Sequence, residues 1–111
     1  MFSRWILGLL LIAGTFIITT TGWSAESISD QRAAELRHLV KQDCGSCHGL
    51  TLKGGLGPAL TPEALGNKPK EAMLATVLHG RPGTPMPPWS SLLSREEANW
   101  IVDLLYRGVE R

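Results

Sequence analysis

The chain has 111 residues, and its 11 basic and 10 acidic side chains give a net charge of +1 at pH 7. This length is enough for one small domain, and the near balance of charge argues against a nucleic-acid-binding protein. The sequence indicates no internal repeat and no nucleotide-binding loop.

Residues 1–25 have the order of a secretory signal peptide. One positive charge, Arg4, precedes an almost wholly apolar stretch at 6–18, and mostly small or polar residues follow up to Ala25. We therefore expect cleavage after Ser24 or Ala25 and export to a bacterial-type periplasm. The alternative is an uncleaved membrane anchor, because residues 6–22 are only slightly shorter than a spanning helix of about 20 residues.

Residues 26–111 are predicted to form the functional domain. A chain of 86 residues makes a marginal core unaided. A large, flat, apolar cofactor would serve as additional core material.

The first predicted helix covers residues 26–43, with Ser27 or Ser29 as its N-cap. His38 lies on its polar side and is predicted to be a solvated surface residue. The opposite side carries an apolar stripe at helical spacing, which continues into two cysteines. The stripe comprises Ala33, Leu36, Val40, Cys44 and Cys47.

Residues 44–48 read Cys-Gly-Ser-Cys-His, which is the attachment signature of c-type haem. If this stretch is near-helical, Cys44 and Cys47 share a face and can form two thioether bonds to one haem. His48 would then supply an axial nitrogen to the iron. Three other interpretations are a disulfide, half of a zinc site and a thioredoxin-like redox pair. The export signal and a methionine loop further along the chain favour haem attachment.

The glycine-rich segment at 49–60 is predicted to be a loop. Thr61 can cap a short helix that starts at Pro62 and ends at residues 66–67. A further helix is predicted to have Pro69 in its first turn and to end near His79, which we interpret as a helix-terminal residue and not as an iron ligand. Its predicted core face comprises Met73, Leu74, Val77 and Leu78.

Residues 81–89 contain four prolines, each of which fixes φ and removes a backbone donor. One interpretation is a proline-rich linker. Because the segment lies between two helices of a small domain, we instead predict a stiff loop that presents Met86 to the iron. A thioether is a neutral, soft ligand that stays bound in both redox states. Trp89 is predicted either to contact the haem or to belong to the ordinary core.

The last predicted helix covers residues 95–107. Ser94 and Glu97 have the spacing of a capping box, and Gly108 is placed to end the helix. Its predicted buried face comprises Ala98, Ile101, Leu104 and Leu105.

These features resemble a class I cytochrome c over residues 28–108. The family pattern has a first helix that ends in the haem motif, a Gly-Pro-x-Leu stretch matched at 57–60, and a late Met-Pro matched at 86–87. The resemblance implies an all-α fold, with about four short helices around one covalently attached haem c. It also implies that the carbonyl of Pro58 accepts a hydrogen bond from His48.

The stretches at 43–49, 51–58 and 80–89 are similar to the NirC-type subfamily. These small periplasmic cytochromes accompany the dissimilatory haem-type nitrite reductase of denitrifying bacteria. The resemblance implies a one-electron carrier and not an enzyme, with nitrite reductase as the redox partner protein. No small-molecule substrate is expected, and contact with a membrane is expected only if the leader at 1–25 is uncleaved.

Two other functions remain open. The first is an accessory factor in maturation of the reductase's d-type haem. The second is a ligand-binding or sensory cytochrome with an open sixth site, which Met86 argues against. For a carrier, the excess of cations at 50–81 would favour an acidic partner patch if those residues line the haem edge. They are Lys53, Lys68, Lys70 and Arg81 against Glu63 and Glu71, and an ordinary solvated surface is the alternative.

Overall fold

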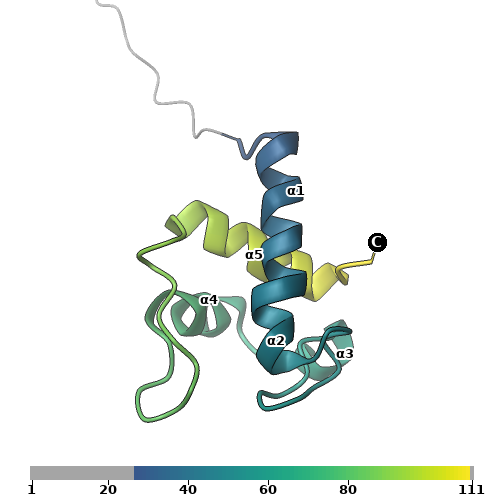
Figure 1. Ribbon diagram of the computed structural model, residues 1–111, viewed down its shortest axis with the longest axis vertical. Helices are drawn as coiled ribbons and strands as arrows, with labels where there is room; N and C mark the ends of the chain where they lie inside the picture. Colours follow the sequence, from purple (N-terminus) through teal and green to yellow (C-terminus); the bar gives the residue numbers. More distant parts are fainter. Residues whose placement is uncertain (1–26, 111) are drawn as a thin grey trace, which may run out of the picture.

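The computed structural model describes residues 27–110, and helices are the only regular elements in that range (Figure 1). The predicted leader at 1–25, with its cleavage site and the alternative of an anchor, lies outside the described residues. Among the helices formed by 27–110, none combines the length and hydrophobicity needed to cross a membrane.

Three helical segments follow one another without a break at the N-terminal side. They are α1 (Asp30–Leu39), the π-helical turn η1 (Val40–Cys44) and α2 (Gly45–His48). The predicted start at residue 26 was wrong, because the hydroxyl of Ser29 accepts a hydrogen bond from the Arg32 N–H at 3.2 Å and caps the helix there. The predicted end at residue 43 was also wrong, since the helix continues through the haem motif to His48.

The short helix α3 (Pro62–Leu65) starts at the predicted residue and ends at Leu65, directly before the stop predicted at 66–67. Its cap is the hydroxyl of Thr61, which accepts a hydrogen bond from the Ala64 N–H at 3.3 Å. Gly66, with φ of 43°, follows its last residue and ends it.

The next helix, α4 (Lys70–His79), corrects the sequence prediction in two details. Pro69 is not in the first turn but stands before the helix with extended backbone, at φ −62° and ψ 127°. Leu74 and Leu78 are buried as predicted, whereas Met73 and Val77 are only half-buried and pack at the margin of the core. The face of α4 that includes Met73 and Val77 therefore lies at the margin of the core, next to the loop at 80–90.

The last helix, α5 (Arg95–Arg107), confirms the predicted capping box. The Glu97 N–H donates to the Ser94 hydroxyl at 3.1 Å, and the Ser94 N–H donates to the Glu97 carboxylate at 2.9 Å. Gly108, with φ of 91°, follows the last turn.

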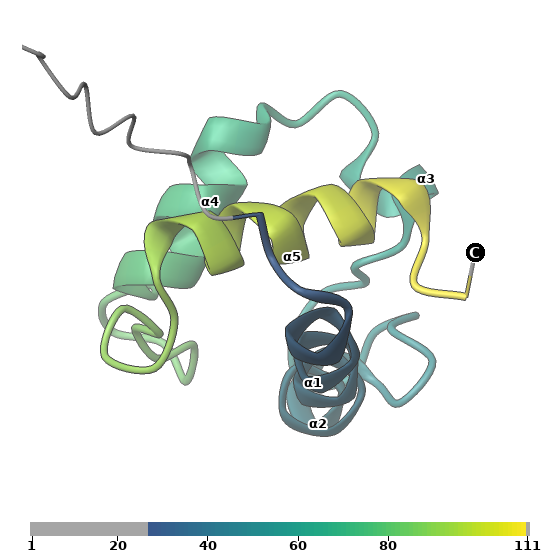
Figure 2. The ribbon, with the colours of Figure 1, turned by 90° about the horizontal axis from the view of Figure 1, so that it is seen from above.

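The helix α5 is the element that contacts each of the other helical units. It crosses α1 and lies against α4 and α3 (Figure 2). An ion pair between Arg32 and Glu97, at 2.5 Å, joins α1 to the first turn of α5. With α1, η1 and α2 taken as one unit, the described residues form four helices around a single apolar core. Its buried residues are Leu36, Val40, Leu52, Leu65, Leu74, Leu78, Leu93, Ala98, Ile101, Val102, Leu104 and Leu105.

Candidate haem site

The helical haem motif presents two free thiols. Cys44 and Cys47 are both half-buried and form no disulfide. The backbone at Cys44 and Gly45 is right-handed helical, so the two sulfur-bearing residues are three positions apart on one continuous helix. Burial raises the pKa of the Cys44 thiol to about 11, so this thiol is protonated at neutral pH before any attachment.

The imidazole of His48 is oriented by the loop that follows it. Its Nδ1 lies 2.7 Å from the carbonyl oxygen of Pro58. Because a carbonyl only accepts, Nδ1 must carry the proton and donate it. The Nε2 lone pair is then free to bind a metal, in the manner of histidine ligands held by an outer partner.

A glycine permits the loop to lie directly against this ring. A Cβ built on Gly57 would lie 2.6 Å from Cε1 and 2.7 Å from Nδ1 of His48, closer than real carbon contacts. The Gly57 N–H also donates to the carbonyl of Cys47 at 2.8 Å, which ties the loop to the end of α2. The side chain of Leu52 anchors the same loop in the core. His48 is thus held between its own helix and a loop whose backbone reaches the ring.

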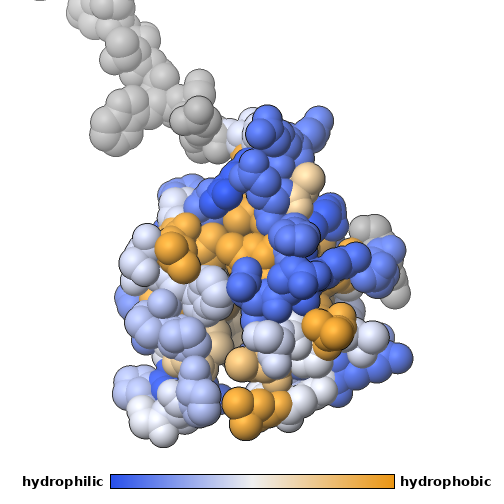
Figure 3. All heavy atoms as spheres, in the orientation of Figure 1, coloured by the Kyte–Doolittle hydropathy of each residue, from blue (hydrophilic) through white to orange (hydrophobic). Residues whose placement is uncertain are grey.

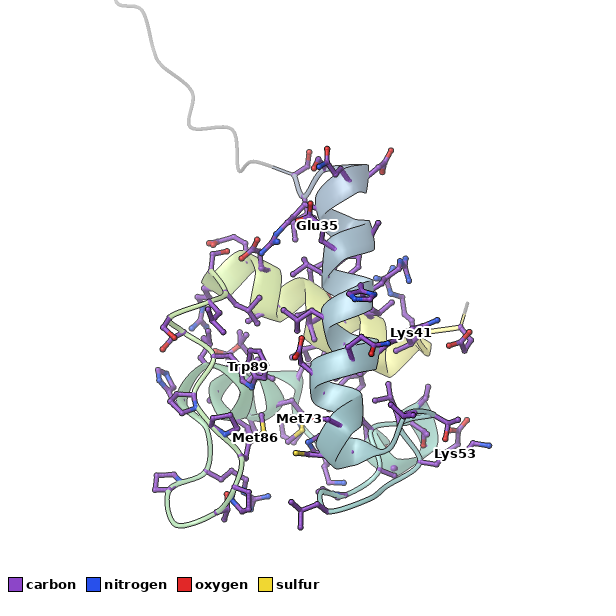
Figure 4. The ribbon with its side chains drawn as sticks, in the orientation of Figure 1. Glu35, Lys41, Lys53, Met73, Met86 and Trp89 are labelled. Carbon is purple, nitrogen blue, oxygen red and sulfur yellow. The ribbon has the colours of Figure 1, made fainter. Side chains whose placement is uncertain are left out.

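The loop at 80–90 lies across a gap from α2 (Figure 4). Gly80, with φ of 67°, starts the loop, and a Cβ there would lie 2.6 Å from the Met86 carbonyl. That carbonyl accepts a hydrogen bond from the Arg81 N–H at 3.1 Å. The Met86 N–H in turn lies 3.3 Å from the hydroxyl of Thr84. These contacts fold the segment back on itself and fix the backbone of Met86.

The far end of this loop is attached to α4. The N–H of Trp89 donates to the carbonyl of Val77 at 3.0 Å, and the N–H of Ser90 lies 3.2 Å from the carbonyl of Leu78. The ring of Trp89 is half-buried and packs against the core. The loop is therefore a rigid extension of α4 and not a free linker.

The surface is hollowed between the loop at 80–90 and the haem motif, and apolar side chains reach its margin (Figure 3). Figure 4 shows Met86 from the loop and Met73 from α4 reaching into this space with their sulfur atoms. The half-buried apolar residues Val77, Cys44 and Leu60 also lie at the edge of the core.

The residues present fit a c-type haem. The thiols of Cys44 and Cys47 are three positions apart on one helix, and the imidazole of His48 has a free Nε2. The thioether of Met86 points toward the same space from the facing loop. Residues 27–110 contain no cluster of three or more His, Cys, Asp or Glu side chains that could hold a metal ion, which argues against the zinc interpretation. A thioredoxin-like pair would need strands, and the described part of the chain has none.

The predicted cations at 50–81 differ in the partners that the structure gives them. Lys70 pairs with Asp103 at 2.5 Å, and the ammonium of Lys68 donates to the carbonyl of Ala64 at 2.7 Å. Lys53 and Arg81 make no ion pair with any other residue of 27–110 and are exposed.

Some residues of this arrangement were not singled out from sequence. The glycine run was predicted to be a loop, but the particular role of Gly57 depends on where the His48 ring lies. The close approach of Gly80 to Met86 likewise depends on the path of the loop. The π turn at 40–44 has no sequence signal that we recognise.

This fold and this donor set define a monohaem c-type cytochrome. The model of the family described as "Cytochrome C oxidase, cbb3-type, subunit III" matches residues 31–105, and the chain belongs to this family of cytochromes. Small cytochromes of this kind are in general electron carriers and not enzymes.

The more particular relationship is to cytochrome c55X. A protein of that name from Pseudomonas aeruginosa is 60% identical, over 89% of this chain and 83% of its own length. A solved structure titled c-type cytochrome NirC is 66% identical, with a TM-score of 0.71, over 72% of this chain and 94% of that one. The structure titled dihydro-heme d1 dehydrogenase NirN in complex with DHE is 38% identical, with a TM-score of 0.58. That match covers 62% of this chain and 15% of the dehydrogenase.

Proposed function

We propose that residues 26–111 form a periplasmic monohaem cytochrome domain that carries one electron at a time, exported by a cleaved leader at 1–25. The observation that carries this proposal is the hydrogen bond between His48 and Pro58, at 2.7 Å. It leaves Nε2 of an imidazole, beside two free thiols, ready for an iron.

The site residues have separate tasks in this proposal. Cys44 and Cys47 would hold the haem covalently, and His48 and Met86 would bind its iron as the two axial ligands. Pro58 fixes the tautomer of His48, and Trp89, whose ring packs against the core, would border the cofactor at the base of the Met86 loop. When bound, the haem supplies the redox centre, whose iron alternates between the ferric and ferrous states.

The chain keeps both ligands in place during electron transfer. His48 is fixed by a hydrogen bond and by the backbone at Gly57. Met86 is fixed by a proline-rich loop that is hydrogen-bonded to α4 at its far end. Since neither ligand has to move when the charge of the iron changes, little rearrangement accompanies the transfer.

The proposed recipient is the dissimilatory haem-containing nitrite reductase of denitrification. Similarity to NirC and cytochrome c55X supports this assignment. Arg81 lies in the Met86 loop, whereas Figure 4 shows Lys53 on the other side of the haem-motif helix, pointing away from Met86. The charge of Arg81 favours an acidic patch on the partner, held through a small and transient interface.

Stopped-flow mixing of the reduced cytochrome with oxidised nitrite reductase tests this partner. We expect the second-order rate to fall as ionic strength rises, because salt screens the attraction. Arg81→Gln should lower both the rate at low salt and its salt dependence, and Lys53→Gln should have a smaller effect because Lys53 lies away from the Met86 side. Lys70→Gln is the matched control, since Lys70 already pairs with Asp103. A rate that does not respond to salt contradicts the proposed docking.

A role in maturation of the d-type haem is the second candidate. It is favoured by the similarity to dihydro-heme d1 dehydrogenase. A dehydrogenase must pass electrons to an acceptor, and a one-electron carrier can take them one at a time. Deleting the gene and measuring the d-type haem content of purified reductase separates the two candidates. Normal haem content with slow nitrite reduction supports electron donation, whereas reductase without its d-type haem supports maturation.

A further inference from the structure

The structure places a second thioether on the Met86 side of the proposed haem site. Met73 and Met86 are the two methionines among residues 27–110. In Figure 4 their side chains come from two different walls, α4 and the loop at 80–90, and their sulfur atoms are turned toward the same space. The sequence pattern assigned Met73 to the core, so the orientation of its sulfur toward the proposed haem site is unexpected.

The burial of α4 shows that Met73 does not belong to the core proper. Leu74 and Leu78 are 3% and 6% exposed and face the helical core. Met73 and Val77, one turn apart, are half-buried and pack only at its margin. These two residues therefore mark the flank of α4 that borders the haem space.

The same flank holds the loop that carries Met86. The carbonyl of Val77 accepts the hydrogen bond from the Trp89 N–H at 3.0 Å. Met73 and Met86 are thus fixed to a single rigid body, so their relative position changes little when other parts of the chain move.

The chemistry of methionine suits Met73 for the same task as Met86. A thioether is neutral and binds iron without losing a proton, and the side chain has three rotatable bonds with which to adapt its reach. The two histidines other than His48, which are His38 and His79, are exposed on α1 and at the end of α4. Neither is as well placed as Met73 to replace Met86.

We propose that Met73 is a reserve axial ligand, which binds the haem iron on the Met86 side when the Met86 sulfur leaves. The exchange breaks one iron–sulfur bond and forms another, and it transfers no proton and no electron. This proposal rests on the proposed function, because it assumes a haem with Met86 as resident ligand. Its consequence is that rotation of the Met86 side chain away from the iron does not leave the iron open to small gaseous ligands.

Four haem-loaded proteins test the proposal: the wild type, Met86→Ala, Met73→Leu, and the double variant. Leucine keeps the apolar volume at position 73 and removes the sulfur. Two readouts are needed. The first is the long-wavelength band of ferric haem with a thioether ligand, and the second is the apparent carbon monoxide affinity of the ferrous form.

We expect Met86→Ala to keep a thioether band and the double variant to lose it. The apparent carbon monoxide affinity of Met86→Ala should be about tenfold lower than that of the double variant, since a bound reserve ligand reduces the fraction of open iron. The control Met86→Ala with Val77→Ile alters the same flank without removing sulfur, and it should behave like Met86→Ala.

Two results overturn the reserve ligand. One is equal carbon monoxide affinity in Met86→Ala and the double variant, and the other is a double variant that stays low-spin. Failure of the proposed function looks different, because Met73→Leu alone would then lose the band, or the wild type would bind carbon monoxide at once. Circular dichroism of each variant confirms that the helices are intact.

Discussion

On the His48 side of the proposed site, the ligand sits at the end of a helix and donates a hydrogen bond to Pro58 from its ring. On the Met86 side, the ligand sits in a proline-rich loop and is fixed through its backbone only. The first arrangement sets the orientation of the side chain itself. The second sets the position of the backbone and leaves the side chain free to turn.

This difference matches the demands of the two ligands. An imidazole must direct one nitrogen at the iron, so its tautomer and ring plane need to be fixed. A thioether binds through a flexible chain and needs only a well-placed starting point. We therefore expect changes on the Met86 side to change which sulfur binds the iron and how fast carbon monoxide enters, and changes on the His48 side to alter the imidazole ligand.

Gly80→Ala should have the largest effect. The new Cβ would lie 2.6 Å from the Met86 carbonyl, at a backbone φ of 67°. Strain and overlap together should lower the free energy of unfolding by about 2–4 kcal/mol and displace the Met86 loop. Urea unfolding measures the stability, and the rate of carbon monoxide binding measures access to the iron.

Gly83→Ala is the matched control for that variant. Gly83 lies in the same loop with φ of 77°, but a Cβ there meets nothing within 4 Å. It should cost only the backbone strain of about 1–2 kcal/mol and leave carbon monoxide binding unchanged. Equal effects of the two substitutions would show that close approach of Gly80 to Met86 does not matter.

Gly57→Ala should have the next largest effect, and on the opposite ligand. Its Cβ would overlap the His48 ring, so the ring or the loop must shift, at a cost of about 1–3 kcal/mol. We expect an altered spectrum from changed imidazole binding. Gly45→Ala is the control within the haem motif, because its Cβ would meet neighbours at an ordinary 3.5 Å. An unchanged spectrum in Gly57→Ala would mean that the loop does not position the ring.

Ser94→Ala tests helix α5, which packs against both α1 and α4. It removes the acceptor for the Glu97 N–H at the start of α5. The expected loss is about 1 kcal/mol of stability, measured by urea unfolding. Since α5 packs against α1, α3 and α4 and supplies none of the proposed ligands, the spectrum and carbon monoxide binding should stay as in the wild type. A changed spectrum would show that the start of α5 affects the binding of His48 or Met86 to the iron.

Arg32→Gln should have the smallest effect, and it should depend on pH. The hydrogen bond from Arg32, followed by that from the Ser94 N–H, holds the pKa of Glu97 below its ordinary value of 4.5. The folded state therefore binds this proton more weakly than the unfolded chain. The stabilisation is fully present above pH 4.5 and is lost as the pH falls through the lower pKa of the folded state.

Arg32 also donates to Glu35 and lowers the pKa of that carboxyl, so the acid-unfolding midpoints of the wild type and Arg32→Gln measure the two contributions together. We expect the difference in stability between the two proteins to shrink below pH 4.5. Arg95→Gln is the control, because its pair with Glu71 is well exposed, and it should leave the acid midpoint unchanged. A difference that persists at low pH would mean that Arg32 acts through packing and not through charge.

The helices were largely predictable from sequence because their signals are local. The caps at Thr61 and Ser94 lie within three residues of the groups they bind, and both were predicted. The start of α1 was missed because two serines could cap it, and only the structure selects Ser29.

The haem site was only partly predictable because its contacts join distant segments. The motif at 44–48 is local and could be recognised directly. The hydrogen bond from His48 spans ten residues, and it was expected through family resemblance and not from spacing. The position of Met73 depends on how α4 and the loop at 80–90 pack together, and helical periodicity alone assigned it to the core.

The central claim is that His48 and Met86 close the iron from both sides. Its most direct test is the absorption spectrum of the exported, haem-loaded and reduced protein, recorded before and after carbon monoxide is added. The account predicts a low-spin, six-coordinate spectrum that the gas does not change. A rapid shift on addition of carbon monoxide would mean an open or labile sixth position and would contradict an electron carrier with two fixed ligands.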